Sequence, residues 1–238
     1  MTHLQVGDIE IDLVKKDIKN LHLSVHPPDG RVRISAPVQM NNEAIRLFAI
    51  SKLSWIKKQR AKFKNQPRQP AREFLSGESH YYQGQRYLLN VITTKKKQRV
   101  ELDGSSQMNL YVREGARKEQ REKVMREWYR RQLKAQIPAL IEKWEKRIGV
   151  KVNSWGVRQM KTKWGSCNTA AKRIWINLEL AKKPPQCLEY IVVHEMVHLL
   201  ERTHNERFVA YLDQYLPHWR NLKEELNSLI FENGSGSL

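Results

Sequence analysis

The stretch Tyr190-Ile-Val-Val-His-Glu-Met-Val-His-Leu-Leu-Glu-Arg-Thr-His204 decides how we interpret the rest of the chain. It holds His194 and His198, with Glu195 directly after the first histidine. Residues four apart lie on one face of a helix, so the two imidazoles can bind one ion from the same side. Zinc binds imidazole nitrogen at about 2.0–2.1 Å, and a carboxylate beside the first ligand can take a proton from water. The stretch therefore predicts a helix that carries a Zn²⁺ site.

A simpler alternative is a buried helix with two hydrogen-bonded histidines and no metal. Glu195 would then be a structural residue. It lies between the apolar residues Val193 and Met196, where a charged group is costly to bury without a partner or a function. The metal-site hypothesis explains this position better.

The composition indicates a strongly basic protein. The 238 residues include 43 lysines and arginines against 25 acidic residues, a formal net charge of +18. Such a surface favours nucleic acid or acidic protein partners. The two cysteines indicate no disulfide framework and a reducing compartment. Because we find no signal peptide and no apolar run near 18 residues, we expect a cytoplasmic protein with no membrane partner. The oligomeric state stays open.

The first part of the chain, residues 1–112, is expected to be a β-rich N-terminal region with one basic helix. Apolar and polar residues alternate in short runs that turn residues separate, which predicts strands at 21–25, 31–35, 81–82, 86–92, 99–102 and 108–112. Gln83-Gly84 is expected to form the tight hairpin turn between the third and fourth of these strands. This part should therefore consist mainly of hairpins.

The basic helix is expected at about 41–65, with Asn41 at its start. Its second half is rich in lysine and arginine around Trp55, which is compatible with a nucleic-acid or acidic-protein surface. A solvated helix face is the simpler explanation. Residues 65–70, rich in glutamine and proline, indicate a linker.

The second part, residues 113–238, mixes a long helix with a small sheet. A helical pattern occupies 116–148, and Gly149 is suited to end it. Strand-like segments at 152–160 and 173–178 precede the metal-site helix. The fold class predicted for the whole chain is therefore α+β.

The third metal ligand must come from beyond the helix, because a residue six positions after His198 would face nearly the opposite way on a continuous helix. Thr203 and Glu206 match a capping box, which would make His204 the first residue of a new helix directed toward the other ligands. His204 is our preferred third ligand. The alternatives are His218, Glu224 and Glu225.

The predicted site is suited to hydrolysis. Glu195 would take the proton of the attacking water and then deliver it to the leaving amine. A further donor should stabilise the oxyanion, and the sequence leaves four candidates, Arg158, Lys163, Tyr190 and Tyr211. Cys167 is better explained as a small buried thiol than as a nucleophile.

Several motifs resemble those of the YgjP-like metallopeptidase family. They are Met160–Cys167, Ile174–Leu178, Tyr190–His198 and His204–Phe208, with earlier matches at 28–37, 55–59 and 82–87. The resemblance implies that residues 113–238 form a zincin-like metallopeptidase domain, related to SprT-like and WLM proteases and to minigluzincins. It also implies zinc ligation by His194, His198 and His204, with Glu195 as the catalytic acid/base.

The same resemblance implies a substrate cleft edged by the strand Ile174–Leu178. The candidate substrate-binding residues are Trp164, Gly165, Ser166, Ile174, Trp175, Ile176 and Asn177. Two positions depart from the family pattern, Asn168–Ala171 in place of a glycine turn and Val209 in place of an aromatic residue. Both bear on turn shape and packing more than on the metal site.

The leading hypothesis is a cytoplasmic zinc metallopeptidase that hydrolyses peptide or protein substrates. The alternative from another class is a nucleic-acid-associated binding protein, or a protease recruited to DNA, that uses the basic surface. From Pro184 on, acidic residues outnumber basic ones, so the excess of positive charge lies earlier in the chain. The substrate and the need for an activator are not evident from the sequence.

Overall fold

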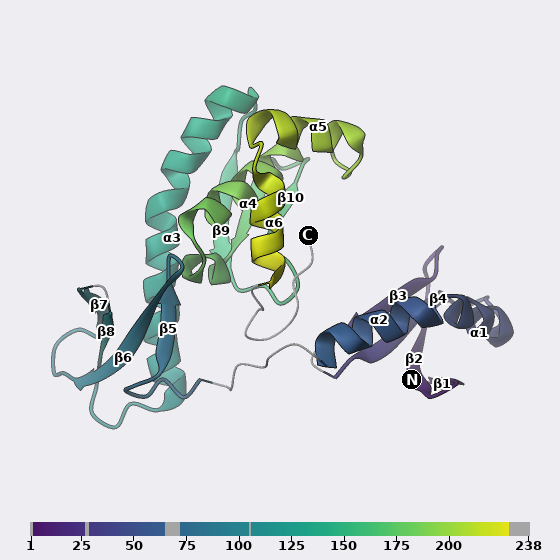
Figure 1. Cartoon of the computed structure of the whole chain (residues 1–238), viewed down its shortest axis with the longest axis horizontal. Helices are drawn as coiled ribbons and strands as arrows, with labels where there is room; N and C mark the ends of the chain where they lie inside the picture. Colours follow the sequence, from purple (N-terminus) through teal and green to yellow (C-terminus); the bar gives the residue numbers. More distant parts are fainter. Residues whose placement is uncertain (1, 27–28, 65–71, 105, 229–238) are drawn as a thin grey trace. The chain divides into compact units, whose positions relative to one another are not determined.

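Small sheets alternate with helices along the chain, and a computed structural model describes residues 2–26, 29–64, 72–104 and 106–228 (Figure 1). The described residues form two compact units, one that ends at residue 64 and one that begins at residue 72. The linker expected at 65–70 lies outside the described residues.

The first unit contains a four-stranded sheet with the order β1-β2-β4-β3. Its strands are β1 (Thr2–Val6), β2 (Ile9–Lys16), β3 (His22–His26) and β4 (Arg31–Pro37). β1 and β2 form one antiparallel pair, β3 and β4 form another, and β2 and β4 are parallel. The strands expected at 21–25 and 31–35 are thus confirmed.

A separate apolar core holds this unit together. Alternate side chains of β2 and β4 are buried on one face, as the two-residue period of a strand requires, namely Ile9, Ile11, Leu13, Val32, Ile34 and Ala36. Ile45, Ala49 and Ile56 from the following helices complete the cluster. The members of this core that the structure describes all belong to the first unit.

The single basic helix expected at 41–65 is two helices, α1 (Asn42–Ser51) and α2 (Leu53–Lys64). Asn41 caps α1 as expected, because its side chain accepts a hydrogen bond from the backbone of Ala44 at 2.7 Å. The helical conformation is interrupted at Lys52, which is the C-cap of α1. The break lets buried residues of both helices reach the same core.

The second unit begins with another four-stranded sheet, of order β5-β6-β8-β7. Its strands are β5 (Ser79–Tyr82), β6 (Gln85–Thr93), β7 (Arg99–Asp103) and β8 (Gln107–Val112). Two antiparallel hairpins are joined through the parallel pair β6 and β8. The strands expected in this part of the chain are confirmed.

The long helix α3 (Lys118–Ile148) packs against this sheet and against α4 (Pro185–Val197). Its buried side chains recur every three or four residues from Met125 to Ile148, which gives one continuous apolar stripe. Gly149 adopts a left-handed conformation with φ 77° and ends the helix, as expected.

A three-stranded sheet lies in the same unit as α4. Its strands are β9 (Ser154–Arg158), β10 (Gly165–Asn168) and β11 (Arg173–Asn177), in the order β10-β11-β9. A short 3₁₀ helix, η1 (Leu178–Lys182), leads from β11 to α4. The chain then continues through α5 (Glu206–Tyr215) and α6 (Trp219–Ser228).

The structure divides the chain earlier than the boundary expected at 112/113. The sheet β5–β8 shares one apolar core with α3 and α4, so it belongs with the second unit. Backbone hydrogen bonds also join its first turn to η1, from Gln83 N to Ala181 O at 2.9 Å and from Gly84 N to Lys182 O at 3.2 Å. The α+β fold class is confirmed.

None of the helices in the described ranges has the length and apolarity needed to cross a membrane.

Candidate active site

The helix α4 carries the first part of the site and is buried almost all round. Pro185 occupies its first turn, where a missing backbone N–H costs nothing. From Tyr190 to Val197 every side chain is buried, because α3, α5, α6 and the sheet β9–β11 surround this helix. A helix buried on all sides offers a fixed base for the polar groups that it holds.

Three imidazoles converge at the end of α4. His204 Nε2 lies 3.1 Å from His194 Nε2 and 3.1 Å from His198 Nε2. Two imidazole ligands about 2.0–2.1 Å from one tetrahedral ion would lie roughly 3.3–3.4 Å apart. Among the described residues, these three histidines form the one group of histidine, cysteine or acidic side chains that could hold a metal ion. The alternatives His218, Glu224 and Glu225 do not join it.

The loop after α4, rather than a new helix, brings His204 to the other two histidines. The expected capping box of Thr203 and Glu206 is wrong, because Asn205 caps α5 by accepting a hydrogen bond from Phe208 N at 3.0 Å. Thr203 instead bonds the carboxylate of Glu201 through its backbone N–H and its hydroxyl. His204 therefore lies just before the helix.

The same loop orients His198. Its Nδ1 lies 3.2 Å from the carbonyl oxygen of Glu201 and must carry the hydrogen, because a carbonyl can only accept. The Nε2 lone pair therefore faces the other two histidines. His194 Nδ1 is buried without a hydrogen-bond partner in the described structure.

The electrostatics of the three histidines suit metal binding. Burial, followed by the charges of His198 and His204, lowers the pKa of His194 to about 3. Burial also lowers the pKa of His198 and of His204. Metal ligation requires neutral imidazoles, so the donor set fits a divalent ion.

Glu195 lies beside the histidines and faces β10. It is 3% exposed, and burial raises its pKa to about 8, with Lys163 acting in the opposite direction. A Cβ atom on Gly165 would lie 2.5 Å from Glu195 Oε1, so the carboxylate occupies the space that a side chain at position 165 would fill. Glycine at this position is what lets the strand approach the carboxylate.

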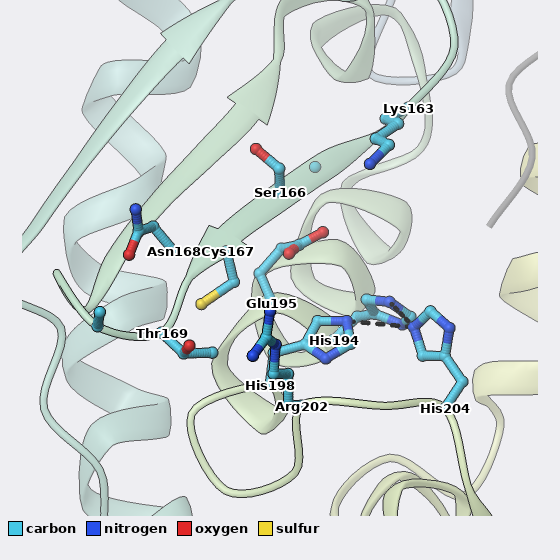
Figure 2. A pocket seen from close by; sticks show the side chains of 12 residues that line it. Lys163, Ser166, Cys167, Asn168, Thr169, His194, Glu195, His198, Arg202 and His204 are labelled. Atoms are coloured by element: carbon cyan, nitrogen blue, oxygen red, sulfur yellow. Dashed lines mark hydrogen bonds between the residues drawn. The ribbon is translucent and has the colours of Figure 1, made fainter. Parts of the chain in front are cut away.

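These groups open into a cleft with a volume of about 610 Å³ (Figure 2). It is lined by the three histidines and Glu195, by residues 165–170 of β10 and the turn after it, and by Lys163 and Arg202. Sequence reasoning missed Arg202 and the turn residues 168–170 as lining residues. Arg202 lies between two proposed ligands in the sequence, a signal that could have drawn attention to it.

The cleft is edged by β10 and not by the strand Ile174–Leu178. Residues 174–177 of that segment belong to β11, which pairs with β10 on one side and β9 on the other, so its backbone is already hydrogen-bonded. Of the predicted substrate-binding residues, Gly165 and Ser166 line the cleft. The other predicted substrate-binding residues, Trp164, Ile174, Trp175, Ile176 and Asn177, do not.

Asn177 has another role in the structure. It is fully buried, and its Nδ2 donates to the carbonyl oxygens of Lys163 at 2.7 Å and Met160 at 3.1 Å. Its Oδ1 accepts from the backbone N–H groups of Met160 and Glu179. One side chain thus fixes the loop that leads into β10 and presents Lys163 to the cleft.

Of the four oxyanion candidates, only Lys163 lines the cleft. Arg158 donates to Ser166 Oγ at 3.4 Å and lies over the ring of Trp175. Tyr190 is fully buried in α4, and its hydroxyl has no hydrogen-bond partner among the described residues. Tyr211 stacks on Tyr215 in α5.

Cys167 lines the cleft but is poorly suited to nucleophilic attack. Burial, followed by the charge of Glu195, raises the pKa of its thiol to about 11. The reactive thiolate would therefore be scarce at neutral pH.

A family model for the YgjP-like metallopeptidase domain matches residues 19–229. The chain belongs to the YgjP-like metallopeptidase family. It is therefore a peptidase that depends on a metal ion and acts on peptide or protein substrates. No protein in a search of curated sequences matches this YgjP-like chain.

Among solved structures, this YgjP-like protein matches the metallopeptidase zymogen abylysin of Pyrococcus abyssi. The identity is 17% with a TM-score of 0.35, and the match covers 37% of this chain and 90% of abylysin.

Proposed function

We propose that this metallopeptidase is a zinc enzyme in which His194, His198 and His204 hold the ion and Glu195 is the general base and acid. The observation that carries the proposal is the convergence of three imidazole Nε2 atoms beside a buried carboxylate at one cleft. Zinc suits a set of three neutral nitrogen ligands that leaves room for water. Bound there, it would act as a Lewis acid toward water and the scissile carbonyl.

Glu195 moves the proton in this proposal. Its raised pKa makes the carboxylate a competent base near neutral pH, and the positive charge of a bound ion would favour its ionised form. It accepts the proton of the attacking water and then passes that proton to the leaving amine nitrogen. The close approach of Gly165 keeps the carboxylate beside the strand along which we place the substrate.

Lys163 is the proposed oxyanion stabiliser. Its side chain lines the cleft. Its positive charge acts on Glu195 and lowers the pKa of that carboxylate, against the larger effect of burial. Asn177 fixes the backbone of Lys163, and the side chain from that position can bring its positive charge to the oxyanion that develops during attack. Figure 2 shows the Lys163 side chain directed toward Glu195.

The edge strand β10 is the proposed binding site for the substrate backbone. One side of β10 pairs with β11, and the other side faces the cleft. An extended peptide can add to such an edge through backbone hydrogen bonds. This arrangement would place a peptide bond next to Glu195.

The enzyme proposal is tested by metal analysis and by cleavage of a peptide library. We expect about one zinc per chain, and we expect Glu195→Gln to keep the zinc while losing at least about 10³-fold in kcat/KM. Glu206→Gln, an exposed substitution at the start of α5, is the matched control and should cleave like the wild type. Equal cleavage by wild type and Glu195→Gln would refute the assignment.

The role of Lys163 has its own test. Lys163→Gln should lower kcat by about 10²–10³-fold with little change in KM, because the interaction forms only in the transition state. Lys161→Gln removes the same charge outside the cleft and should leave kcat unchanged. A change in KM alone would assign Lys163 to substrate binding instead.

A second candidate role is binding of nucleic acid or an acidic protein by the first unit. On α2, Trp55 is 43% exposed and stands in sequence between the exposed residues Lys52, Lys57 and Lys58. Aromatic stacking with cationic neighbours is suited to single-stranded nucleic acid. We expect binding to an oligonucleotide that weakens steeply with salt and weakens further in Trp55→Ala. Absence of binding at low salt would remove this candidate.

A further inference from the structure

Two cations line the cleft, and neither forms an ion pair in the described part of the chain. Lys163 and Arg202 make no side-chain ion pair or hydrogen bond there. The one acidic residue that lines the cleft is Glu195, which is 3% exposed. A bound metal ion would add further positive charge. The cleft is therefore electropositive around a single buried carboxylate.

The acidic residue next to Arg202 is committed elsewhere. Glu201 accepts hydrogen bonds from Thr203 and has Arg207 Nε at 4.0 Å. Its carbonyl oxygen accepts from His198 Nδ1. The loop that carries Arg202 is thus fixed at its backbone, while Arg202 forms no ion pair with any residue that the structure describes.

The two cations come from different elements. Lys163 precedes β10, and Arg202 belongs to the loop after α4. In the view of Figure 2, the carboxylate of Glu195 lies between Lys163 and Arg202. Lys163 is assigned above to the reacting carbonyl, which leaves Arg202 available to a neighbouring group of the substrate.

We infer that Arg202 selects substrates that carry a carboxylate close to the scissile bond. The planar guanidinium can donate two parallel hydrogen bonds to one carboxylate. A substrate with a neutral side chain in place of the carboxylate cannot form this charged pair. The net charge of +18 would also speed the approach of acidic polypeptides. The inference rests on the proposed function, since it assumes that the substrate binds in this cleft. The carboxylate can be an acidic side chain or the substrate C-terminus.

The test uses binding to the full-length Glu195→Gln variant loaded with zinc, so that peptides stay intact. Fluorescent peptides are compared in pairs, with glutamate against glutamine at each position and a free C-terminus against an amide. We expect at least about tenfold tighter binding of the acidic member at one position. Which pair shows the preference identifies the source of the carboxylate.

Adding Arg202→Gln should abolish this preference, and Arg202→Glu should reverse it toward lysine or arginine peptides. Arg207→Gln is the matched control, because Arg207 is exposed and lies outside the cleft. It should keep the preference. Circular dichroism of each variant establishes that the fold is retained, and the reversal by Arg202→Glu separates recognition from misfolding.

Two outcomes would overturn the inference. One is equal binding of acidic and neutral peptides by the Glu195→Gln protein, and the other is an acidic preference that survives Arg202→Gln. Failure of the proposed function has a different signature. In that case the wild type would not cleave the peptides, while an Arg202-dependent preference in binding would still support this inference.

Discussion

The two four-stranded sheets have the same strand order but different structural surroundings. In each, two antiparallel hairpins meet through a parallel central pair, β2 with β4 and β6 with β8. The first sheet closes its own core with α1 and α2. The second shares its core with α3 and with α4, the helix that carries His194 and Glu195. The same topology therefore serves as a separate unit in one case and as part of the catalytic unit in the other.

The apolar faces of the two sheets explain this difference. Side chains of β2 and β4 are covered by Ile45, Ala49 and Ile56 from short helices that follow at once. Strands β7 and β8 pack against α3, a helix of 31 residues. The same helix also packs against α4, where Trp144 Nε1 donates to Glu189. The helices that cover the apolar face of a sheet, rather than its strand order, therefore decide which unit the sheet joins.

Truncation should separate the two sheets most clearly. Removal of residues 1–69 should leave zinc binding and cleavage of short peptides, because the core of the second unit is complete without them. Removal of residues 1–112 should abolish folding, because it exposes the apolar stripe of α3. Circular dichroism and zinc content measure both. A folded, active product of the longer truncation would show that the second sheet is dispensable.

Matched core substitutions should show the same contrast on a smaller scale. Ile34→Ala in β4 and Leu110→Ala in β8 both empty a fully buried site, and each should cost about 2–5 kcal/mol of unfolding free energy. Only Leu110→Ala should lower the temperature at which peptidase activity is lost. Thermal scans followed by activity and by circular dichroism test this. Loss of activity in parallel with unfolding of Ile34→Ala would contradict separate cores.

Low pH should affect the second sheet more than the first. His80 in β5 is 1% exposed, and burial, followed by the charge of Arg72, lowers its pKa to about 4 from an ordinary value of 6.5. His3 in β1 is 56% exposed. Since the unfolded chain binds a proton that the folded chain excludes, the stability that neutral His80 contributes is present above about pH 6.5 and is lost as pH falls toward 4.

This loss should amount to roughly 2–3 kcal/mol for a group with such a lowered pKa. Urea unfolding of wild type and His80→Asn at pH 7.5 and pH 5 measures it, and the variant should show a smaller change. His3→Asn should behave like the wild type. An unchanged pH dependence in His80→Asn would mean that other groups account for it.

The smallest difference between the two sheets is expected for the loss of stability when the glycine in the first turn of each is replaced by alanine. Gly7 has φ 59° with open space around a Cβ, whereas Gly84 has φ 82° and a Cβ there would lie 2.9 Å from Pro184 Cγ. Both alanine substitutions meet the backbone strain of the left-handed region, about 1 kcal/mol. Gly84→Ala should cost about 1–2 kcal/mol more than Gly7→Ala, because the turn must move away from Pro184 at the start of α4. If urea unfolding shows the same loss of free energy for both variants, Pro184 must move aside for the new Cβ atom at little cost.

The local features of the fold could be predicted from the sequence. Alternation in β4 and β8, the cap at Asn41 and the end of α3 at Gly149 all depend on neighbours a few residues away. The break at Lys52 was missed, because a continuous basic pattern does not show that two faces must reach one core. The capping box at Thr203 was wrong, because Asn205 competes for the same helix start with a better-placed side-chain oxygen.

The sequence by itself determined the histidine pair and the glutamate of α4, since helical spacing places His194 and His198 on one face without help from the rest of the chain. Only the tertiary structure decided that β10 and not β11 edges the cleft, and that Lys163 and Arg202 share it with Glu195. It likewise decided which sheet joins the catalytic unit. Such pairings depend on groups far apart in the chain, which packing brings together and no local spacing specifies.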